Sequence, residues 1–383
     1  MSLRPTVAVI SELAIEANVR TLGAHVAPAA VCAVVKANGY GHGAVASARA
    51  GLRGGAAMLA VAMVEEGIEL RAAGLAAPIL LLSEFPAGAE AEVVAHRLTA
   101  AVYSADRIDS LAAEAASAKS IADVHLKVDT GMHRVGCSPT DAVRLAKHIV
   151  SADSLRLAGT FTHLAVADDP ANPYTTLQVS RFHEVLAELR EAGIDPGIVH
   201  AANSAGGIAH PSAHFDMVRF GVSLYGNSPD SALDLRTYGL ILQPAMTLRS
   251  MISFVKVVAA GERVSYGLRW TADRDRVVAT VPIGYADGVP RRLSSVGGEV
   301  LVGGQRRPIV GRITMDQILV DCGVDCGVDG GIDGGVRVGD EVILLGRQGP
   351  EQITAWEWAD RLDTIAYEIT CGISSRIPRV SED

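Results

Sequence analysis

Residues 31–43 read VCAVVKANGYGHG: five apolar residues, a lysine and a glycine-rich turn. An apolar run of this length is typical of a strand that is covered on both faces, as the strands of parallel sheets are. The turn at residues 39–43 is not the G-x-G-x-x-G pattern that binds dinucleotides after the first strand of an open α/β sheet. The stretch therefore favours a parallel α/β fold other than the dinucleotide-binding one.

The pattern that starts at residue 31 repeats along the first part of the chain. Short apolar runs alternate with longer Ala-, Leu-, Glu- and Arg-rich stretches of helical period, as in consecutive βα units. Eight strands alternating with seven helical segments predict a closed (β/α)8 barrel of the TIM type better than an open sheet. The expected strands cover residues 31–35, 58–62, 78–82, 98–103, 124–129, 157–163, 198–202 and 215–220.

The character of the chain changes after about residue 236. Strand-like runs are interrupted there by glycine and proline, which predicts a mostly β second domain with one helical stretch at residues 354–370. We therefore expect a barrel domain at residues 1–235 and a mostly β domain at residues 236–383. A short strand at residues 7–10 could pair in either domain. The expected strands of the second domain cover residues 276–282, 299–302, 318–320 and 341–345.

Composition limits the class of ligand. The chain has 383 residues with 34 basic and 43 acidic side chains, so its formal net charge is 34 minus 43, or -9. A negative chain is a poor partner for nucleic acid or an anionic membrane surface, so we expect a small-molecule ligand. The longest apolar run, residues 74–82, is much shorter than the roughly 20 residues that span a bilayer. With no secretory signal at the N-terminus, the expected location is cytoplasmic.

The cysteines predict neither a disulfide framework nor a metal site. There are five, none of them in a CxxC pair, and this pattern is typical of reduced thiols. Residues 321–336 repeat with a period of four, as DCGV twice, then DGGI and DGGV. The known glycine- and aspartate-rich calcium repeat has a period of nine, so a surface hairpin loop is the preferred interpretation.

In a (β/α)8 barrel the chemistry lies at the carboxyl ends of the strands. Polar side chains follow the expected strands repeatedly, and closure of the barrel would place the first strand beside the eighth. These side chains belong to Lys36, Lys127, Asp129, Arg134, His163, Asn203, Ser204 and Arg219.

Lys36 follows a buried run, and burial together with the nearby Arg219 would lower the pKa of its amine. Such an amine can form a Schiff base with a carbonyl, although a lysine paired with a carboxylate at the barrel rim remains an alternative. Ser204 and Gly221 lie where barrels often bind phosphate through backbone N–H groups, although Ser204 could equally be an N-cap. A reactive amine beside a phosphate site suggests pyridoxal 5'-phosphate.

Several segments of this chain, in the same order, resemble the alanine racemase family. The resemblance implies a barrel, a β domain and a head-to-tail homodimer in which each active site takes residues from both subunits. The segments are AVVKANGYGHG (33–43), KVDTGMHR (127–134), THLA (162–165), HAANS (200–204), VRFGVSLYG (218–226), VSYG (264–267), IGYADG (283–288), GRITMDQ (311–317) and YEITCGISSR (367–376).

The resemblance implies roles for individual residues. Lys36 would hold the cofactor and act as the base for D-alanine, and Tyr266 of the partner subunit would act on L-alanine from the opposite face. Without the resemblance, Tyr266 would be interpreted as a packed aromatic residue. The implied cofactor-binding residues are Lys36, Tyr40, His163, Asn203, Ser204, Arg219, Gly221, Val222 and Tyr367.

The substrate would be held by Arg134, Met315 and Asp316, although Arg134 alone could be a rim ion pair. Lys127, His200 and Tyr285 are expected to support the site or narrow its entrance. His200 would hydrogen-bond Arg219 or, alternatively, be a satisfied core histidine. Lys127 corresponds to a lysine that is carbamylated in some family members.

The expected function is therefore interconversion of L- and D-alanine, which supplies D-alanine for peptidoglycan. The alternatives are a racemase of broader range that also accepts serine, a decarboxylase of the same architecture, and a cofactor-binding homeostasis protein. The last would not need the second domain that carries Tyr266.

Overall fold

The computed structural model describes residues 4–324 and 335–381. Contacts within the chain divide it into two compact units, one formed by Leu13–Gln243 and the other by the first twelve residues together with Pro244–Asp383. No helix in the described part of the chain is both long and apolar enough to cross a membrane.

The first unit is the predicted barrel, and all eight expected strands are present. Two four-stranded parallel sheets have the orders β4-β3-β2-β9 and β5-β6-β7-β8. The strands are β2 (Ala30–Val34), β3 (Met58–Val61), β4 (Ile79–Leu81), β5 (Ala100–Val102), β6 (Ala122–Lys127), β7 (Leu155–Phe161), β8 (Ile198–His200) and β9 (Met217–Phe220).

Both edges of the two sheets are joined, so the barrel is closed. A parallel bridge between Leu80 and Thr99 links β4 to the start of β5. On the other side, the Arg219 N–H donates to the Ala202 carbonyl at 3.1 Å and connects β9 to the end of β8. Because closure makes β2 a neighbour of β9, Cys32 pairs with Arg219 in register.

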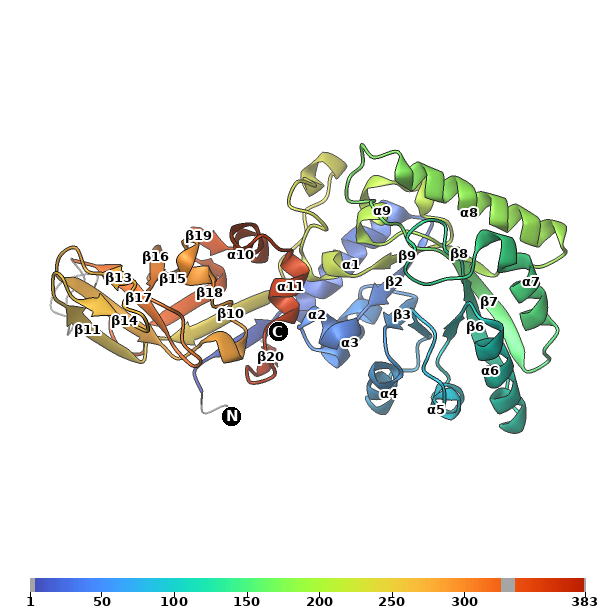
Figure 1. Cartoon of the computed structure of the whole chain (residues 1–383), viewed down its shortest axis with the longest axis horizontal. Coiled ribbons are helices and arrows are strands. Elements are labelled where there is room, and N and C mark those ends of the chain that lie inside the picture. The colour runs from blue at the N-terminus through green and yellow to red at the C-terminus, as the bar shows by residue number, and fades with distance from the viewer. Residues whose placement is uncertain (1–3, 325–334, 382–383) are drawn as a thin grey trace. The chain divides into compact units, whose positions relative to one another are not determined.

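Helices cover the outside of the barrel strands (Figure 1). Their apolar faces are buried, as expected for amphipathic crossover helices. They are α1 (Glu12–Val26), α3 (Ala44–Arg53), α4 (Val64–Ala72), α5 (Glu90–Ala95), α6 (Ala105–Ser117), α7 (Pro139–Val150) and α8 (Tyr174–Glu191). The short α2 (Lys36–Tyr40) and α9 (Ser204–Ala209) follow the carboxyl ends of β2 and β8.

The second unit contains a large and mostly antiparallel sheet, which confirms the predicted β domain. Its main path runs β11-β14-β17-β16-β15-β18-β10-β1-β20. The strands are β1 (Val7–Ile10), β10 (Met246–Met251), β11 (Phe254–Val258), β14 (Arg276–Val281), β15 (Glu299–Val302), β16 (Gln305–Val310), β17 (Ile318–Gly323), β18 (Glu341–Gln348), β19 (Glu351–Ile353), which pairs with β18, and β20 (Arg379–Ser381); β12 (Arg263–Val264) and β13 (Trp270–Thr271) form a separate ribbon.

The strand near the N-terminus, for which the sequence left both domains open, pairs in this sheet. β1 lies antiparallel to β10, with Val7 opposite Arg249, and parallel to β20. The expected helical stretch at residues 354–370 is two helices, α10 (Ala355–Leu362) and α11 (Ala366–Cys371). They separate at Asp363, whose left-handed backbone (φ 59°) ends α10.

Candidate active site at the carboxyl end of the barrel

Lys36 begins α2 directly after β2, in a turn with unusual backbone geometry. Ala37, Asn38 and Tyr40 have φ values of 53°, 52° and 51°, a left-handed region in which residues with a Cβ are disfavoured. Contacts from neighbouring elements hold the turn: the Ala37 N–H donates to the Glu66 carboxylate at 2.6 Å, and Asn38 Oδ1 accepts from the Ala44 N–H at 2.9 Å. The turn therefore fixes where the Lys36 and Tyr40 side chains leave the backbone.

Tyr40, Ser204 and Gly221 converge from three elements. Ser204 Oγ accepts a hydrogen bond from the Gly221 N–H at 2.9 Å. A Cβ added to Gly221 would lie only 2.4 Å from the Tyr40 hydroxyl, so only a residue without a side chain allows this approach. Asn203 caps α9 by accepting from the Gly206 N–H at 2.9 Å, so its side chain serves the helix end. Hydroxyls and backbone N–H groups of this kind suit a phosphate.

Arg219 projects from β9 into a buried network without a carboxylate. Its Nη1 lies 2.7 Å from His200 Nδ1, and its Nη2 lies 3.0 Å from His163 Nδ1. Nη2 also donates to the Thr162 and Ala201 carbonyls at 2.9 and 2.8 Å. Burial lowers the pKa of Arg219 to about 10. The guanidinium is thus a buried cation that no carboxylate in the described ranges pairs with.

The hydrogen bonds define the proton positions of the two histidines that follow. Burial and then the charge of Arg219 hold the pKa of His200 well below its usual value, so the ring is neutral. Because a guanidinium can only donate, His200 Nδ1 accepts, and its proton lies on Nε2. Nε2 is 2.9 Å from His125 Nδ1, which therefore accepts in turn. Burial lowers the pKa of His125 to about 4, so this ring is neutral too.

His125 is a site residue that the sequence pattern did not predict. It lies in the middle of β6, two residues before Lys127, so both side chains point to the same side of the strand. The available signal was a histidine within a buried strand, two residues before Lys127, which was already a predicted site residue. Its partner His200 is 75 residues away, and the rings meet because β6 and β8 both pair with β7.

Lys127 is buried at the end of β6 and donates to the Leu82 carbonyl at 2.8 Å. Burial, followed by the charges of Arg219, Arg134 and Lys36, lowers its pKa to about 7. Arg134 and His163 line a small pocket together with Lys127. No ion pair of Arg134 occurs within residues 4–324 and 335–381, so this part of the chain does not support the rim ion pair that the sequence allowed.

The remaining predicted residues belong to the second unit. Tyr266, Tyr285 and Met315 are exposed by 72%, 42% and 52%. The segments that carry Tyr285 and Met315 are joined, because the Tyr285 N–H donates to the Thr314 carbonyl at 3.0 Å and the Ala286 N–H to the Met315 carbonyl at 3.1 Å. Tyr367 is part of α11.

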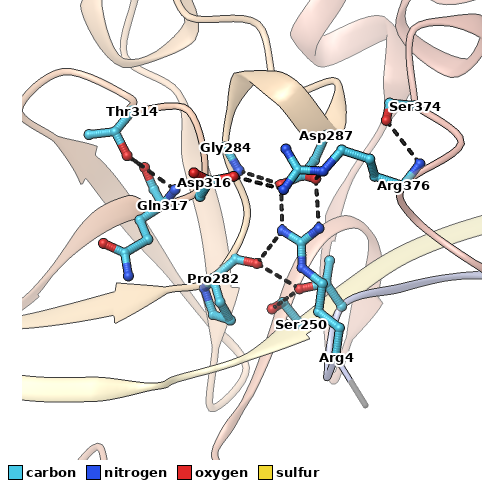
Figure 2. Close-up of polar contacts among 11 residues, drawn as sticks. Arg4, Ser250, Pro282, Gly284, Asp287, Thr314, Asp316, Gln317, Ser374 and Arg376 are labelled. Atoms are coloured by element: carbon cyan, nitrogen blue, oxygen red, sulfur yellow. Dashed lines mark hydrogen bonds and ion pairs between the residues drawn. The ribbon is translucent and has the colours of Figure 1, made fainter. Parts of the chain in front are cut away.

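Asp316 pairs with Arg376 at 2.7 Å, in a group of charged residues that Figure 2 shows.

No group of three or more potential metal ligands is found among the residues that the structure describes. The four-residue repeat falls largely on residues 325–334, outside the described residues.

The site fits pyridoxal 5'-phosphate. Three features suit an anionic aldehyde: the Lys36 amine at the end of β2 with the buried Lys127 beside the same site, a cradle that a Cβ would fill, and a buried arginine without a carboxylate partner among the described residues. The fold and this site define a pyridoxal-phosphate enzyme built on a (β/α)8 barrel.

Comparison with known proteins specifies the family. The model of the alanine racemase N-terminal domain matches residues 10–229, and that of the C-terminal domain matches residues 245–381. The chain belongs to the alanine racemase family. It is 46% identical to an alanine racemase of Symbiobacterium thermophilum, over 98% of this chain and 97% of that protein.

Solved structures agree over the whole length. An alanine racemase from D-cycloserine-producing Streptomyces lavendulae is 40% identical with a TM-score of 0.92, covering 100% of this chain and 98% of that one. An alanine racemase from Bartonella henselae with covalently bound pyridoxal phosphate is 31% identical with a TM-score of 0.85, covering 98% and 99%. The family and architecture expected from the sequence are confirmed.

Proposed function

We propose that this protein interconverts L- and D-alanine with pyridoxal 5'-phosphate as cofactor. The observation that carries the proposal is the buried Arg219 guanidinium, held by neutral histidines and carbonyls beside Lys36 and the Tyr40–Ser204–Gly221 cradle. When bound, the cofactor supplies an electron sink that makes the Cα proton of an amino acid removable.

Lys36 would attach the cofactor through its amine. Tyr40, Ser204, Gly221, Val222 and Tyr367 would hold the phosphate, with Asn203 supporting Ser204, and His163 would lie against the ring. The convergence of the Tyr40 and Ser204 hydroxyls on the Gly221 backbone supports the phosphate assignment, since both hydroxyls can donate to a phosphate.

Arg219 would face the pyridine nitrogen. A guanidinium remains protonated and cannot accept a proton, so it leaves that nitrogen unprotonated. The weaker electron sink that results disfavours side reactions such as transamination, at some cost in Cα acidity. The His200–His125 pair supports this role because it holds the guanidinium in one orientation.

Two groups on opposite faces of the substrate would move the proton. Lys36 would serve the D-alanine face and Tyr266 the L-alanine face, because racemisation removes a proton on one side and returns one on the other. The 72% exposure of Tyr266 supports a role at a second surface rather than in its own core. The loop presents it between Ser265 and Gly267, both with positive φ.

We propose that Tyr266, Tyr285, Met315 and Asp316 act in the site of the partner subunit of a head-to-tail homodimer. Their exposure in the single chain supports this assembly. Arg134 and the Met315 backbone would hold the substrate carboxylate, since a guanidinium can bind it with two hydrogen bonds. The cytoplasmic location and the supply of D-alanine for peptidoglycan remain predictions from the sequence and the family.

Circular dichroism tests the function directly. The purified protein should be yellow with cofactor bound, and the signal of L-alanine should decay to zero as the racemate forms. A panel of L-amino acids, serine included, then measures substrate breadth. Persistent optical activity of alanine in the presence of bound cofactor would overturn the proposal.

A further inference from the structure

Asp287 is a fully buried carboxylate in the second unit, and two arginines share it. Arg4 donates to both oxygens, at 2.7 Å for Oδ1, and Nε of Arg376 lies 3.4 Å from Oδ1. The Gly284 N–H donates to the other oxygen at 3.0 Å. Burial alone would raise the pKa of Asp287, but the hydrogen bonds of Arg4 and Gly284 and the charges of Arg4 and Arg376 lower it below its usual value.

Arg376 continues from Asp287 to a second carboxylate. Its Nη2 donates to Asp316 at 2.7 Å, so one guanidinium spans the buried Asp287 and the exposed Asp316 (Figure 2). An isolated surface ion pair contributes little because both side chains remain mobile. Here the buried Asp287 carboxylate lies 3.4 Å from Nε of the same guanidinium, so its charge orients Arg376 toward Asp316.

Backbone contacts join the segments that carry Asp287 and Asp316. The turn at 284–287 and the segment at 314–316 are hydrogen-bonded to each other, and a Cβ on Gly284 would lie 2.3 Å from the Thr314 carbonyl oxygen. The segment around Ser374 also packs on this turn, because the Ser374 N–H donates to the Asp287 carbonyl at 3.0 Å. Arg376 thus links the Tyr285 turn to the residue that follows Met315.

We propose that Arg376, anchored on Asp287, is a positioning residue that fixes the Met315–Asp316 segment for binding of the substrate carboxylate. The inference rests on the proposed function, in which the Met315 backbone contacts that carboxylate. Arg376 would hold this backbone in place, and the buried Asp287 would orient Arg376 as well as stabilise its own turn.

The test compares Arg376→Gln and Asp316→Asn in the full-length enzyme with cofactor. Both variants should raise KM for L-alanine by about fivefold or more, a size consistent with loss of one oriented ion pair. In Arg376→Gln, which alters a residue outside the proposed site, kcat should stay within about twofold. The inhibition constant of acetate, a carboxylate that undergoes no proton transfer, should rise by the same factor. In the double variant, KM and the acetate inhibition constant should rise no further than in the single variant with the larger effect, because both substitutions remove the same interaction.

Arg306→Gln is the matched control. Arg306 is a half-buried arginine of the same unit that bonds Glu299, Glu351 and Glu357, none of which belongs to the Tyr285 or Met315 segment. Its loss should lower the melting temperature and leave KM and the acetate constant unchanged. An Arg376→Gln enzyme that binds acetate like wild type, or that loses only stability as the control does, overturns the inference. Absence of racemisation in the wild type would instead overturn the proposed function.

Discussion

The Nη1 atom of Arg219 lies 2.7 Å from Nδ1 of His200, and both side chains are buried inside the barrel. Because the guanidinium can only donate, the proton of the neutral His200 ring lies on Nε2. From there it is donated in a hydrogen bond to Nδ1 of His125. Two histidine side chains from two other strands therefore orient the Arg219 guanidinium. This relationship gives the first of four predictions.

Replacing His125 by leucine should destabilise the protein. The change removes the acceptor for the Nε2–H of His200, and an unpaired buried donor costs about 1–3 kcal/mol. His125→Asn, which keeps an acceptor at the position of Nδ1, should retain more of the stability. Urea unfolding measures both variants, and a leucine variant as stable as wild type would contradict the assigned proton positions.

Gly221→Ala should weaken cofactor binding while leaving the fold intact. The new methyl group would lie 2.4 Å from the Tyr40 hydroxyl and must displace it from the cradle. We expect the dissociation constant of pyridoxal 5'-phosphate to rise about tenfold, or roughly 1.4 kcal/mol, as measured by titration of the apoenzyme. Gly23→Ala in α1 is the control, because its methyl group would meet Val31 at an ordinary 3.5 Å. If Gly221→Ala bound the cofactor as tightly as the wild type, the assignment of the Tyr40–Ser204–Gly221 cradle to the phosphate would be contradicted.

Lys127 should react with carbon dioxide in a pH-dependent way. With a pKa of about 7, the amine is largely neutral above pH 7 and an ammonium below it. The neutral amine can bond to the carbon of CO2 and release a proton, and the nearby Arg134 and Arg219 would stabilise the resulting anion. Carbon-13 NMR with labelled bicarbonate should show a carbamate at pH 8 that disappears below pH 6. The signal should be lost in Lys127→Ala and kept in Lys147→Ala, which alters an exposed lysine of α7. A signal that persists without Lys127 would contradict the prediction.

Tyr266→Phe should slow exchange of the Cα proton of L-alanine much more than that of D-alanine. Loss of a positioned acid or base costs about 10²–10⁴-fold, so exchange of the L-alanine Cα proton with deuterated solvent should fall by that factor. Exchange from D-alanine, which depends on Lys36, should persist. Tyr238→Phe, a change in the linking segment before β10, serves as the control. An equal loss from both enantiomers would argue against two separate bases.

The sequence predicted the barrel well because strand order in a (β/α)8 fold follows chain order. Each apolar run lies between helices of regular period, and the eight runs correspond to β2 to β9 within a few residues. The helical stretch at 354–370 was less well predicted, because the break depends on the single left-handed residue Asp363. Lys36, Arg134 and Arg219 could be predicted as candidate site residues because cations in or just beyond strands stand out against the surrounding apolar runs.

The sequence by itself determined the alternation of elements, the family and the residue types available at the barrel mouth. It could not determine contacts between residues that are distant along the chain. Arg4 and Asp287 are 283 residues apart, and they meet only because β1 joins the C-terminal sheet. His125 meets His200 only because β6 and β8 pair with opposite edges of β7 in a particular register. Periodicity reports the local burial of each strand, whereas the partner of a buried charge or ring is decided by how the strands pair in three dimensions.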